Sequence, residues 1–227
     1  MRKRWCIPTV GAEFVWRMED LLELYALAYN PQRPLVCFDE KSVQLVAETR
    51  QALPAAPGKP ERYDYEYKRN GTRNLFVYFQ PWIGWRHVRV TAQRTKRDFA
   101  ECMRYLVDEL FPEAEVIVLV VDNLNTHTPA ALYEAFPPAE AQRILKRLEF
   151  HYTPKHGSWL NMVEIEIGVL SNQCLDRYIP DEETLRTEIA AWEKTRNEQQ
   201  ATIDCQFTTA KARIKLQRLY PVISKSH

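Results

Sequence analysis

The sequence predicts an α/β fold in which a mixed β-sheet is flanked by helices. Two apolar runs of strand length, residues 35–40 and 116–122, each close in an acidic residue. Two further runs rich in β-branched and aromatic residues, 74–80 and 86–92, are separated by a proline and a glycine, which is typical of a hairpin. Segments with apolar residues at helical spacing lie between and after these strands. This order of strands and helices favours a layered α/β domain.

The N-terminal third of the chain predicts a helix, a strand and an insertion. Apolar residues at helical spacing indicate a short amphipathic helix over residues 14–30, which Pro31 and Pro34 end. Residues 35–40 predict a buried strand with acidic residues at its carboxyl end. Residues 51–73 are rich in Pro, Gly, Lys and Arg, so we expect an exposed and partly irregular insertion there.

The rest of the chain alternates helices with two more strands. The strongest strand signal is 116–121, which is continuous and β-branched and therefore central in the sheet. Thr128 is the expected N-cap of one helix and Asp181 of another. The remaining elements that we expect are helices at 95–110, 129–136 and 138–146, a strand at 148–153, a helix carrying Leu160, Val163, Ile167 and Leu170, and helices at 181–198 and 208–219.

Length and composition indicate one main domain. The 227 residues with 45% hydrophobic content can bury one sizeable core. We expect that domain over residues 35–227, with a helical C-terminal tail. Residues 1–34 form a short helical lead-in without a complete helix-turn-helix unit. The 31 basic and 30 acidic residues leave a net charge of +1, so any affinity for nucleic acid must come from local patches.

Cysteine usage and hydropathy bear on the compartment. The five cysteines are odd in number and include no close CxxC pair, which disfavours a disulfide framework and a zinc finger. Free thiols in a reducing cytoplasm are expected. The sequence contains no apolar run of the ~18 residues that span a membrane, and the basic start is not followed by a signal-peptide core. We therefore expect a soluble cytoplasmic protein with no membrane partner.

Three acidic residues stand where chemistry is expected. Asp39 ends the first strand and Asp122 ends the most apolar strand. Ligands gather beyond the carboxyl ends of strands in open α/β sheets. Glu164 lies on the helix after the last strand and can reach the same place. Carboxylates that converge repel one another, and a hard divalent cation such as Mg²⁺ or Mn²⁺ relieves that repulsion. Two such ions, about 3.5–4 Å apart, promote phosphodiester cleavage.

The spacing alone leaves a structural interpretation open. An Asp after a strand is often only a turn or cap residue. Glu40 should point to the opposite side of the sheet from Asp39, and Glu166 should lie about 200° around the helix from Glu164. Asn125 and His127 follow Asp122 in a loop and either orient a water or phosphate or shape the turn. His151 and His156 lack the spacing of metal ligands and are expected to be structural or close to DNA.

Four segments resemble the DDE transposases. Residues 38–40 (Phe-Asp-Glu), 121–127 (Val-Asp-Asn-Leu-Asn-Thr-His) and 156–164 (His-Gly-Ser-Trp-Leu-Asn-Met-Val-Glu) resemble the acidic motifs of that family. The most similar group is the mariner-like superfamily, in its bacterial branch named after insertion sequence six-thirty. Residues 207–216 resemble the usual ending of that branch. The resemblance runs from about residue 14 to Pro221.

The resemblance implies a ribonuclease-H-like fold and a metal-dependent reaction on double-stranded DNA. Two Mg²⁺ ions per site, with Mn²⁺ as a substitute, would support cleavage at the element's ends and strand transfer into target DNA. The family's two aspartates fall on Asp39 and Asp122, and its glutamate falls on Glu164. Its asparagine falls on Asn161, one helical turn before Glu164 and so on the same face. We expect an active homodimer that is nucleoid-associated when bound to DNA.

The chain departs from the family pattern in two ways. Members normally carry an N-terminal helix-turn-helix region, but only about 34 residues precede the first strand. In addition, 41 residues separate Asp122 from Glu164, which is longer than in many mariner-like relatives. The helix-forming stretch around residues 138–147 accounts for the extra length.

DNA-facing residues are expected around the third motif. Lys155 and His156 precede the glutamate helix, and Trp159 either packs there or stacks on a splayed DNA end. Asn123 and His127 would support the site. Two further basic clusters are candidates for DNA contact or are solvated faces, namely Lys59, Arg62, Lys68, Arg69 and Arg73 interleaved with Tyr63, Tyr65 and Tyr67, and Lys211, Arg213, Lys215 and Arg218.

Three functions follow from the sequence. The first is the catalytic domain of a transposase. The second is a catalytically silent or truncated remnant that only binds DNA or a full-length partner. The third is a phosphatase with an Asp nucleophile, which usually has two acids close together after one strand. The residues after Asp39 are Glu-Lys-Ser-Val, which lack that pattern.

Overall fold

The computed structural model describes residues 11–49, 57–59 and 66–221. Its centre is a five-stranded sheet with the strand order β3-β2-β1-β4-β5. In that sheet β1 pairs antiparallel with β2 and parallel with β4, and the outer pairs are antiparallel β2–β3 and parallel β4–β5. The strands are β1 (Leu35–Glu48), β2 (Tyr67–Gln80), β3 (Trp85–Thr91), β4 (Ile117–Val121) and β5 (Leu148–Tyr152). The predicted mixed sheet is confirmed.

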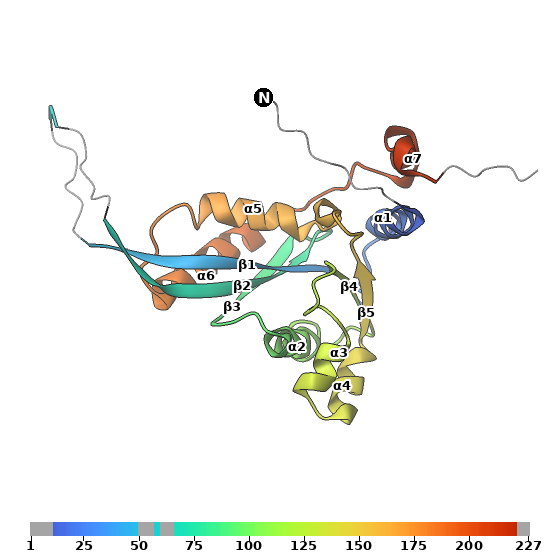
Figure 1. The fold of residues 1–227 in the computed structure, drawn as a ribbon, viewed down its shortest axis with the longest axis horizontal. Helices are drawn as coiled ribbons and strands as arrows, with labels where there is room; N and C mark the ends of the chain where they lie inside the picture. Colours follow the sequence, from blue (N-terminus) through green and yellow to red (C-terminus); the bar gives the residue numbers. More distant parts are fainter. Residues whose placement is uncertain (1–10, 50–56, 60–65, 222–227) are drawn as a thin grey trace, which may run out of the picture.

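Helices cover both faces of this sheet (Figure 1). One face packs against α1 (Ala12–Tyr25), α5 (Val163–Gln173), α6 (Glu182–Glu198) and α7 (Thr209–Lys215). The other packs against α2 (Lys96–Tyr105), its π-helical continuation η1 (Leu106–Leu110), α3 (Ala130–Ala135) and α4 (Pro138–Leu145). Two short 3₁₀ turns, η2 (Ser158–Leu160) and η3 (Gln217–Leu219), complete the described elements.

The alternation of side chains along β1 divides the two cores. Leu35 and Cys37 are buried in the core beneath α5, whereas Val36 and Phe38 are buried in the core above α2. Successive side chains of a strand point to opposite faces. The next residue, Asp39, therefore emerges on the α5 face and Glu40 on the α2 face, as predicted.

The strand that carries Asp39 is longer than predicted. β1 continues to Glu48 and pairs with residues 67–73 of β2, which were expected to be part of an irregular insertion. These residues are mostly exposed and polar, so their side chains give no alternating pattern. Backbone hydrogen bonds between the two strands hold them instead. The resulting ribbon extends away from the rest of the sheet at the left of Figure 1. Residues 50–56 and 60–65 of the predicted insertion lie outside the described residues.

Three helix boundaries differ from the prediction. α1 ends at Tyr25, well before Pro31, and α3 begins at Ala130 with no side-chain cap from Thr128. The helix predicted to carry Leu160 begins only at Val163, because a separate 3₁₀ turn contains Leu160. Cap preferences place helix ends only to within one or two residues. The cap at Asp181 is confirmed, since its side chain accepts a hydrogen bond of 2.8 Å from the Thr184 amide.

Two further findings concern the described cysteines and helices. Cys37, Cys102, Cys174 and Cys205 are free thiols, while Cys6 lies outside the described residues. In the part of the chain that the structure describes, no helix is both long enough and apolar enough to cross a membrane.

Candidate active site

The first two acidic residues lie on neighbouring strands, where the pairing of β1 with β4 ends. Asp122 follows the end of β4, as predicted, but Asp39 lies inside β1, which continues to Glu48, so its predicted place at the end of a strand is wrong. β1 and β4 are parallel and adjacent, with Cys37 opposite Val120. Asp39 lies two residues beyond Cys37 along β1, and Asp122 lies two residues beyond Val120, just past the end of β4. The shared register therefore brings the two carboxylates to the same edge of the sheet.

Glu164 reaches this edge from α5, where it occupies the first turn. The loop before α5 is tied to the sheet beside Asp39. Buried Asn161 donates a hydrogen bond of 3.0 Å from Nδ2 to the Phe38 carbonyl, and Tyr25 donates one of 2.7 Å to the Leu160 carbonyl. Asn161 precedes the helix rather than lying on it, so the predicted shared helical face with Glu164 is wrong. Its role is to attach the start of α5 to β1.

The neighbouring carboxylates act electrostatically on Asp39. Burial raises the pKa of Asp39 to about 7, and the charges of Asp122, Glu40 and Glu164 add to the rise. A hydrogen bond of 2.8 Å from the Glu40 amide to Asp39 Oδ1 opposes it. Asp39 is only 9% exposed, so little water screens these charges. The negative charge of ionised Asp39 is therefore not neutralised by the neighbouring residues of the site.

Asp122 is held by a buried histidine. His127 Nδ1 lies 2.6 Å from Asp122 Oδ1, and its Nε2 lies 2.9 Å from Oε2 of Glu40. The Leu124 amide also donates to Asp122 Oδ1 at 3.0 Å. His127 is 1% exposed. Its ring therefore contacts the two carboxylates and has almost no contact with solvent.

This arrangement favours a charged imidazole. Burial opposes the charge on His127, but the contacts with Asp122 and Glu40 outweigh it and raise its pKa to about 9. Burial alone would raise the pKa of Asp122. The contacts with His127 and the Leu124 amide outweigh burial, so the pKa of Asp122 is lowered. Asp122 therefore ionises at a lower pH than Asp39.

An open pocket of about 320 Å³ borders Asp122. Lys155 and His156 are exposed on its wall, and neither has an ion-pair partner among the described residues. Asn123 also lines the pocket, but its Nδ2 donates to the Thr153 carbonyl and so joins the ends of β4 and β5. The lining residues are Asp122, Asn123, Leu124, Thr153, Pro154, Lys155, His156 and Ser158.

A rigid turn presents Lys155 and His156. His156 has a φ of 63°, a left-handed conformation that is uncommon outside glycine. The Gly157 amide donates to the Pro154 carbonyl at 2.9 Å. A Cβ at Gly157 would lie 2.5 Å from Pro154 Cγ, so only glycine fits there. The turn therefore holds both basic residues at the pocket.

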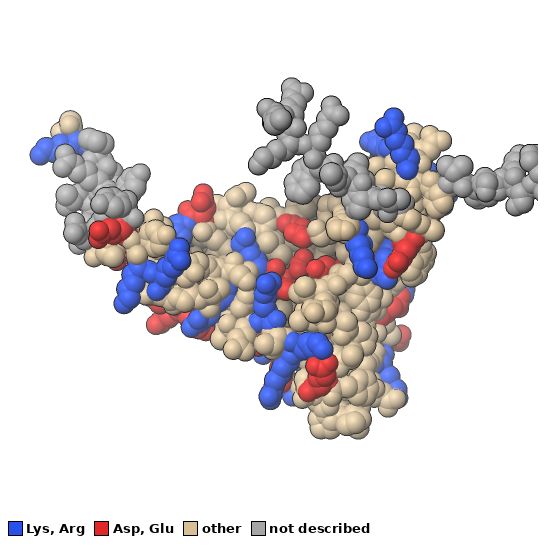
Figure 2. Space-filling view, in the orientation of Figure 1, with Lys and Arg blue, Asp and Glu red and all other residues tan. Residues whose placement is uncertain are grey.

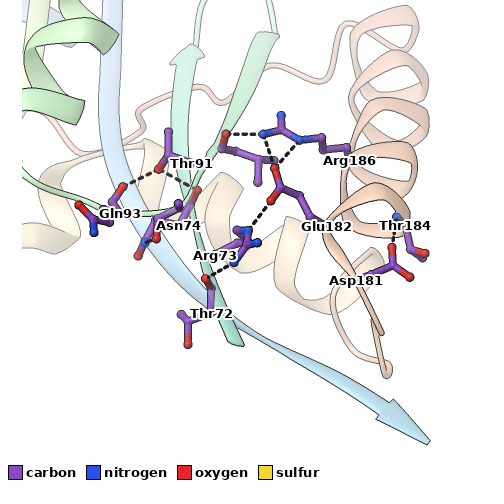
Figure 3. A network of polar contacts seen from close by, with 11 residues as sticks. Thr72, Arg73, Asn74, Thr91, Gln93, Asp181, Glu182, Thr184 and Arg186 are labelled. Atoms are coloured by element: carbon purple, nitrogen blue, oxygen red, sulfur yellow. Dashed lines mark hydrogen bonds and ion pairs between the residues drawn. The ribbon is translucent and has the colours of Figure 1, made fainter. Parts of the chain in front are cut away.

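The other residues predicted to contact DNA differ in their surroundings: one is exposed outside the pocket, and two form ion pairs within the protein. Trp159 is 53% exposed, with its ring 6.3 Å from that of Phe207, and it does not line the pocket. Arg73 is paired with Glu182 at 2.5 Å, as Figure 3 shows, and Arg213 is paired with Glu19 at 2.8 Å. These two arginines therefore connect elements of the fold through ion pairs. Arg62, Tyr63 and Tyr65 lie outside the described residues.

The surface view in Figure 2 shows acidic and basic side chains near one another on the visible face. In Figure 2 acidic side chains gather near the middle of the visible face, and Lys and Arg side chains lie on both sides of them. A surface of this kind can place a phosphodiester between cations and carboxylates.

Sequence reasoning missed one set of buried charges. Glu166 faces away from Glu164 as predicted, but it is fully buried and pairs with Arg86 and Arg196. The only sequence signals were an arginine within an alternating strand and a glutamate within an apolar helix. Neither signal identifies its partner, because the partners lie far apart in the chain.

The donor set suits a hard divalent cation. Asp39, Asp122 and Glu164 offer only carboxylate oxygens, which Mg²⁺ and Mn²⁺ prefer. Asp39 in particular has the raised pKa of a carboxylate whose charge lacks a counter-ion. Among the described residues, no three His, Cys, Asp or Glu side chains already form a preassembled metal cluster.

Comparison with known proteins identifies the fold and the family of this chain. The five-stranded mixed sheet flanked by helices is a ribonuclease-H-like fold. It superposes on the structure described as the Mos1 mariner paired end complex with Mn, with a TM-score of 0.52 and 16% identity over 88% of this chain and 61% of that one. The family model described as DDE superfamily endonuclease matches residues 34–186, and the chain belongs to that family.

Other comparisons are less close. The structure described as the Mos1 Strand Transfer Complex gives a TM-score of 0.44 and 15% identity over 88% of this chain and 65% of that one. No curated protein matches the sequence. The chain spans 61% of the length of the first of these Mos1 structures. Membership of the mariner-like superfamily, and within it of the insertion sequence six-thirty branch, stays a prediction.

Proposed function

We propose that this chain is the catalytic domain of a DNA transposase, which cleaves DNA strands and transfers a 3′-hydroxyl end to target DNA. Water would first attack the phosphodiester at an element's end, which breaks the bond to the 3′ oxygen and leaves a 3′-hydroxyl. That hydroxyl would then attack a phosphodiester of the target, and the target's own 3′ oxygen would leave. The family description, an endonuclease, supports the first of these steps.

The observation that carries the proposal is the convergence of three carboxylates from three elements. Asp39 lies on β1, Asp122 just after β4 and Glu164 on α5. The pKa of Asp39 is raised by burial and by the charges of Asp122, Glu40 and Glu164, which supports a common site for the three acids. Acids that serve only as turn or cap residues would have no reason to surround a buried carboxylate such as Asp39.

Asp39, Asp122 and Glu164 are the residues that would hold Mg²⁺ or Mn²⁺. When bound, two such ions would activate the attacking oxygen and stabilise the leaving oxygen. The residues around them have separate tasks. His127 keeps Asp122 ionised and oriented, and Asn161 attaches the start of α5 to β1, which places Glu164.

Lys155 and His156 would bind the DNA backbone. Both lie on the wall of the pocket beside Asp122 without a competing carboxylate partner among the described residues. An unpaired cation next to a cluster of acids suits a phosphate that must approach that cluster. Exposed Trp159 would stack on a base of a splayed end.

The proposed partners are double-stranded DNA, as element ends and as target, and a second copy of the chain. The printed description of the Mos1 structure names a paired end complex with Mn. For this chain, DNA binding and a homodimer are proposals by analogy of fold and family.

Joining of DNA ends tests the proposal. A labelled oligonucleotide with a free 3′-hydroxyl and the element's terminal repeat is incubated with a supercoiled plasmid and Mg²⁺. We expect the wild type and Glu113→Gln to join it, because Glu113 is an exposed acid before β4, away from the carboxyl ends of the strands. Asp122→Asn and Glu164→Gln should abolish joining. Full joining by either variant would refute the assignment.

A further inference from the structure

We propose that Glu166, clamped between Arg86 and Arg196, is a positioning residue that sets the rotation of α5 and thereby places Glu164 in the site. The proposal rests on the function proposed above. It concerns a cluster of buried charges that takes no part in the carboxylate chemistry itself.

Glu166 joins three elements through two arginines. Its Oε1 lies 3.0 Å from Nε of Arg86 on β3, and its Oε2 lies 3.1 Å from Nη2 of Arg196 on α6. Arg196 also donates from Nε to Oε1 at 3.2 Å. The side chains of Arg86 and Glu166 are both 0% exposed. A buried carboxylate with two charged partners has little freedom to move, because any displacement leaves a charge unpaired.

Arg86 is in turn held by hydrogen bonds from both of its terminal nitrogens. Its Nη2 donates to the Ala201 carbonyl at 2.7 Å, and its Nη1 donates to Asn197 Oδ1 at 3.3 Å. The Asn197 side chain also bonds the backbone of Arg86, accepting from its amide and donating to its carbonyl, both at 2.9 Å. The Arg86 guanidinium, which contacts Glu166, therefore also connects β3 to the end of α6.

The other end of α6 is anchored to the sheet as well. Glu182 pairs with Arg73 of β2 at 2.5 Å and with Arg186 at 2.7 Å, and Arg186 donates to the Val90 carbonyl of β3 at 2.9 Å (Figure 3). With both ends attached to the strands, α6 offers Arg196 as a fixed support. The family match ends at residue 186, so Arg196 and Asn197 lie beyond it.

Asn161 and Tyr25 hold the loop before α5, but the helix itself contributes little to the stability of its first turn. No side chain caps its N-terminus, and Gly168 stands exposed in its middle with nothing within 4 Å of where a Cβ would be. Both features weaken a helix locally. Tertiary contacts must therefore hold the first turn, which contains Glu164, and Glu166 supplies charged ones from within that turn.

The lever is short. Glu164 and Glu166 are two residues apart, so they point to nearly opposite sides of the helix. A rotation that released Glu166 from its arginines would swing Glu164 across the site by a similar arc. A misplacement of about 1 Å in a catalytic group can cost about 100-fold in rate.

The experiment compares Glu166→Gln and Arg86→Lys with Gln173→Met. Gln173 accepts a hydrogen bond of 3.0 Å from Trp192 in the same contact between α5 and α6, but at the far end of α5. The readouts are plasmid nicking at saturating Mn²⁺, the Mn²⁺ concentration at half-maximal rate, and amide hydrogen exchange of residues 163–167.

We expect Glu166→Gln and Arg86→Lys to slow nicking at saturating Mn²⁺ about 10–100-fold or to raise the Mn²⁺ midpoint about 10-fold, with unchanged half-saturation by DNA. Exchange in the first turn of α5 should quicken. Gln173→Met should change each readout less than about twofold, even where it lowers the melting temperature equally.

The double variant Glu166→Met/Arg86→Met separates positioning from stability. An apolar pair often restores the stability lost when a buried ion pair is broken. If nicking stays slow although the melting temperature recovers, Glu166 positions Glu164. If nicking recovers together with stability, or if exchange of the first turn is unchanged in Glu166→Gln, the proposal fails. A wild type that neither nicks DNA nor binds Mn²⁺ would refute the transposase function, and the exchange data would still decide whether Glu166 holds α5.

Discussion

His127 lies between two carboxylates that have different surroundings. Asp122 borders the open pocket, whereas the Glu40 side chain is 3% exposed. Among the described residues, its one other ion-pair partner is Arg94 at 3.5 Å. The sequence placed His127 in a loop after Asp122 and allowed a role toward water, phosphate or the turn. Only the folded chain shows Glu40 as its second partner, because the two residues are far apart in sequence.

Removal of the His127 imidazole should leave Glu40 buried and poorly paired. We expect His127→Ala to lower the free energy of unfolding by about 3 kcal/mol. Glu40→Leu/His127→Leu should lose less than the sum of the two single leucine variants, since both charges then leave together. Urea unfolding in EDTA measures these values. Additive losses would show that the two side chains do not interact.

Lys155 gives a second prediction at this scale. As an unpaired cation on the wall of the pocket, it should contact a DNA phosphate. Lys155→Ala should weaken DNA binding and reduce the slope of log affinity against log salt concentration by about one. Lys146→Ala is the control, because Lys146 is exposed just before β5, at the opposite end of that strand. An unchanged slope for Lys155→Ala would place the DNA elsewhere.

At the scale of elements, the loop before α5 joins the last motif to the first strand. Asn161→Leu keeps the branched shape of the side chain but removes the hydrogen bond to the Phe38 carbonyl. We expect a loss of about 1–3 kcal/mol in stability and a larger loss of nicking than stability explains. Tyr25→Phe removes the neighbouring bond to Leu160. It should cost similar stability but retain most of the activity. Equal activity in both variants would contradict a special role for Asn161.

Some elements were predictable from sequence and others were not, for physical reasons. The β4 prediction is confirmed because all five of its residues are buried and apolar, so the pattern is unambiguous. The outer half of β2 was missed because its residues are exposed and held by backbone pairing. The start of α5 was missed because η2 interrupts the apolar spacing before it.

The candidate site was predictable in part. Local patterns predict Asp122 just after a strand and Glu164 on a helix, and the structure has both there. Asp39 was predicted at the end of a strand but lies inside β1, because the exposed, polar second half of β1 gives no apolar pattern. The roles of the three acids in catalysis stay a prediction. The Arg86–Glu166 pair could not be predicted, because nothing in an alternating strand specifies a partner 80 positions away.

At the scale of the whole molecule, the site should make the metal-free protein sensitive to pH. A carboxyl whose pKa is raised on folding binds more protons in the folded state, so stability falls as pH rises between the two values, here about 4 and 7 for Asp39. The raised pKa of His127, about 9, extends the fall to higher pH, since the stability from its charge is lost as it deprotonates.

Thermal melting in EDTA checks this prediction. The melting temperature should be lower at pH 8 than at pH 6, and Asp39→Asn should reduce that difference. Adding Mg²⁺ at pH 8 should raise the melting temperature of the wild type, because a ligand that binds only the folded state stabilises it. A wild type whose melting temperature does not respond to Mg²⁺ at pH 8 would argue against a metal site at these carboxylates.

The central claim is that Asp39, Asp122 and Glu164 act together in metal-dependent cleavage of DNA. Nicking of a supercoiled plasmid in Mg²⁺ tests it most directly, with Asp39→Asn, Asp122→Asn and Glu164→Gln compared with the wild type and Glu113→Gln. We predict that each of the three variants folds but nicks at least about 100-fold more slowly, whereas Glu113→Gln matches the wild type. Nicking by any of the three at the wild-type rate would contradict the account.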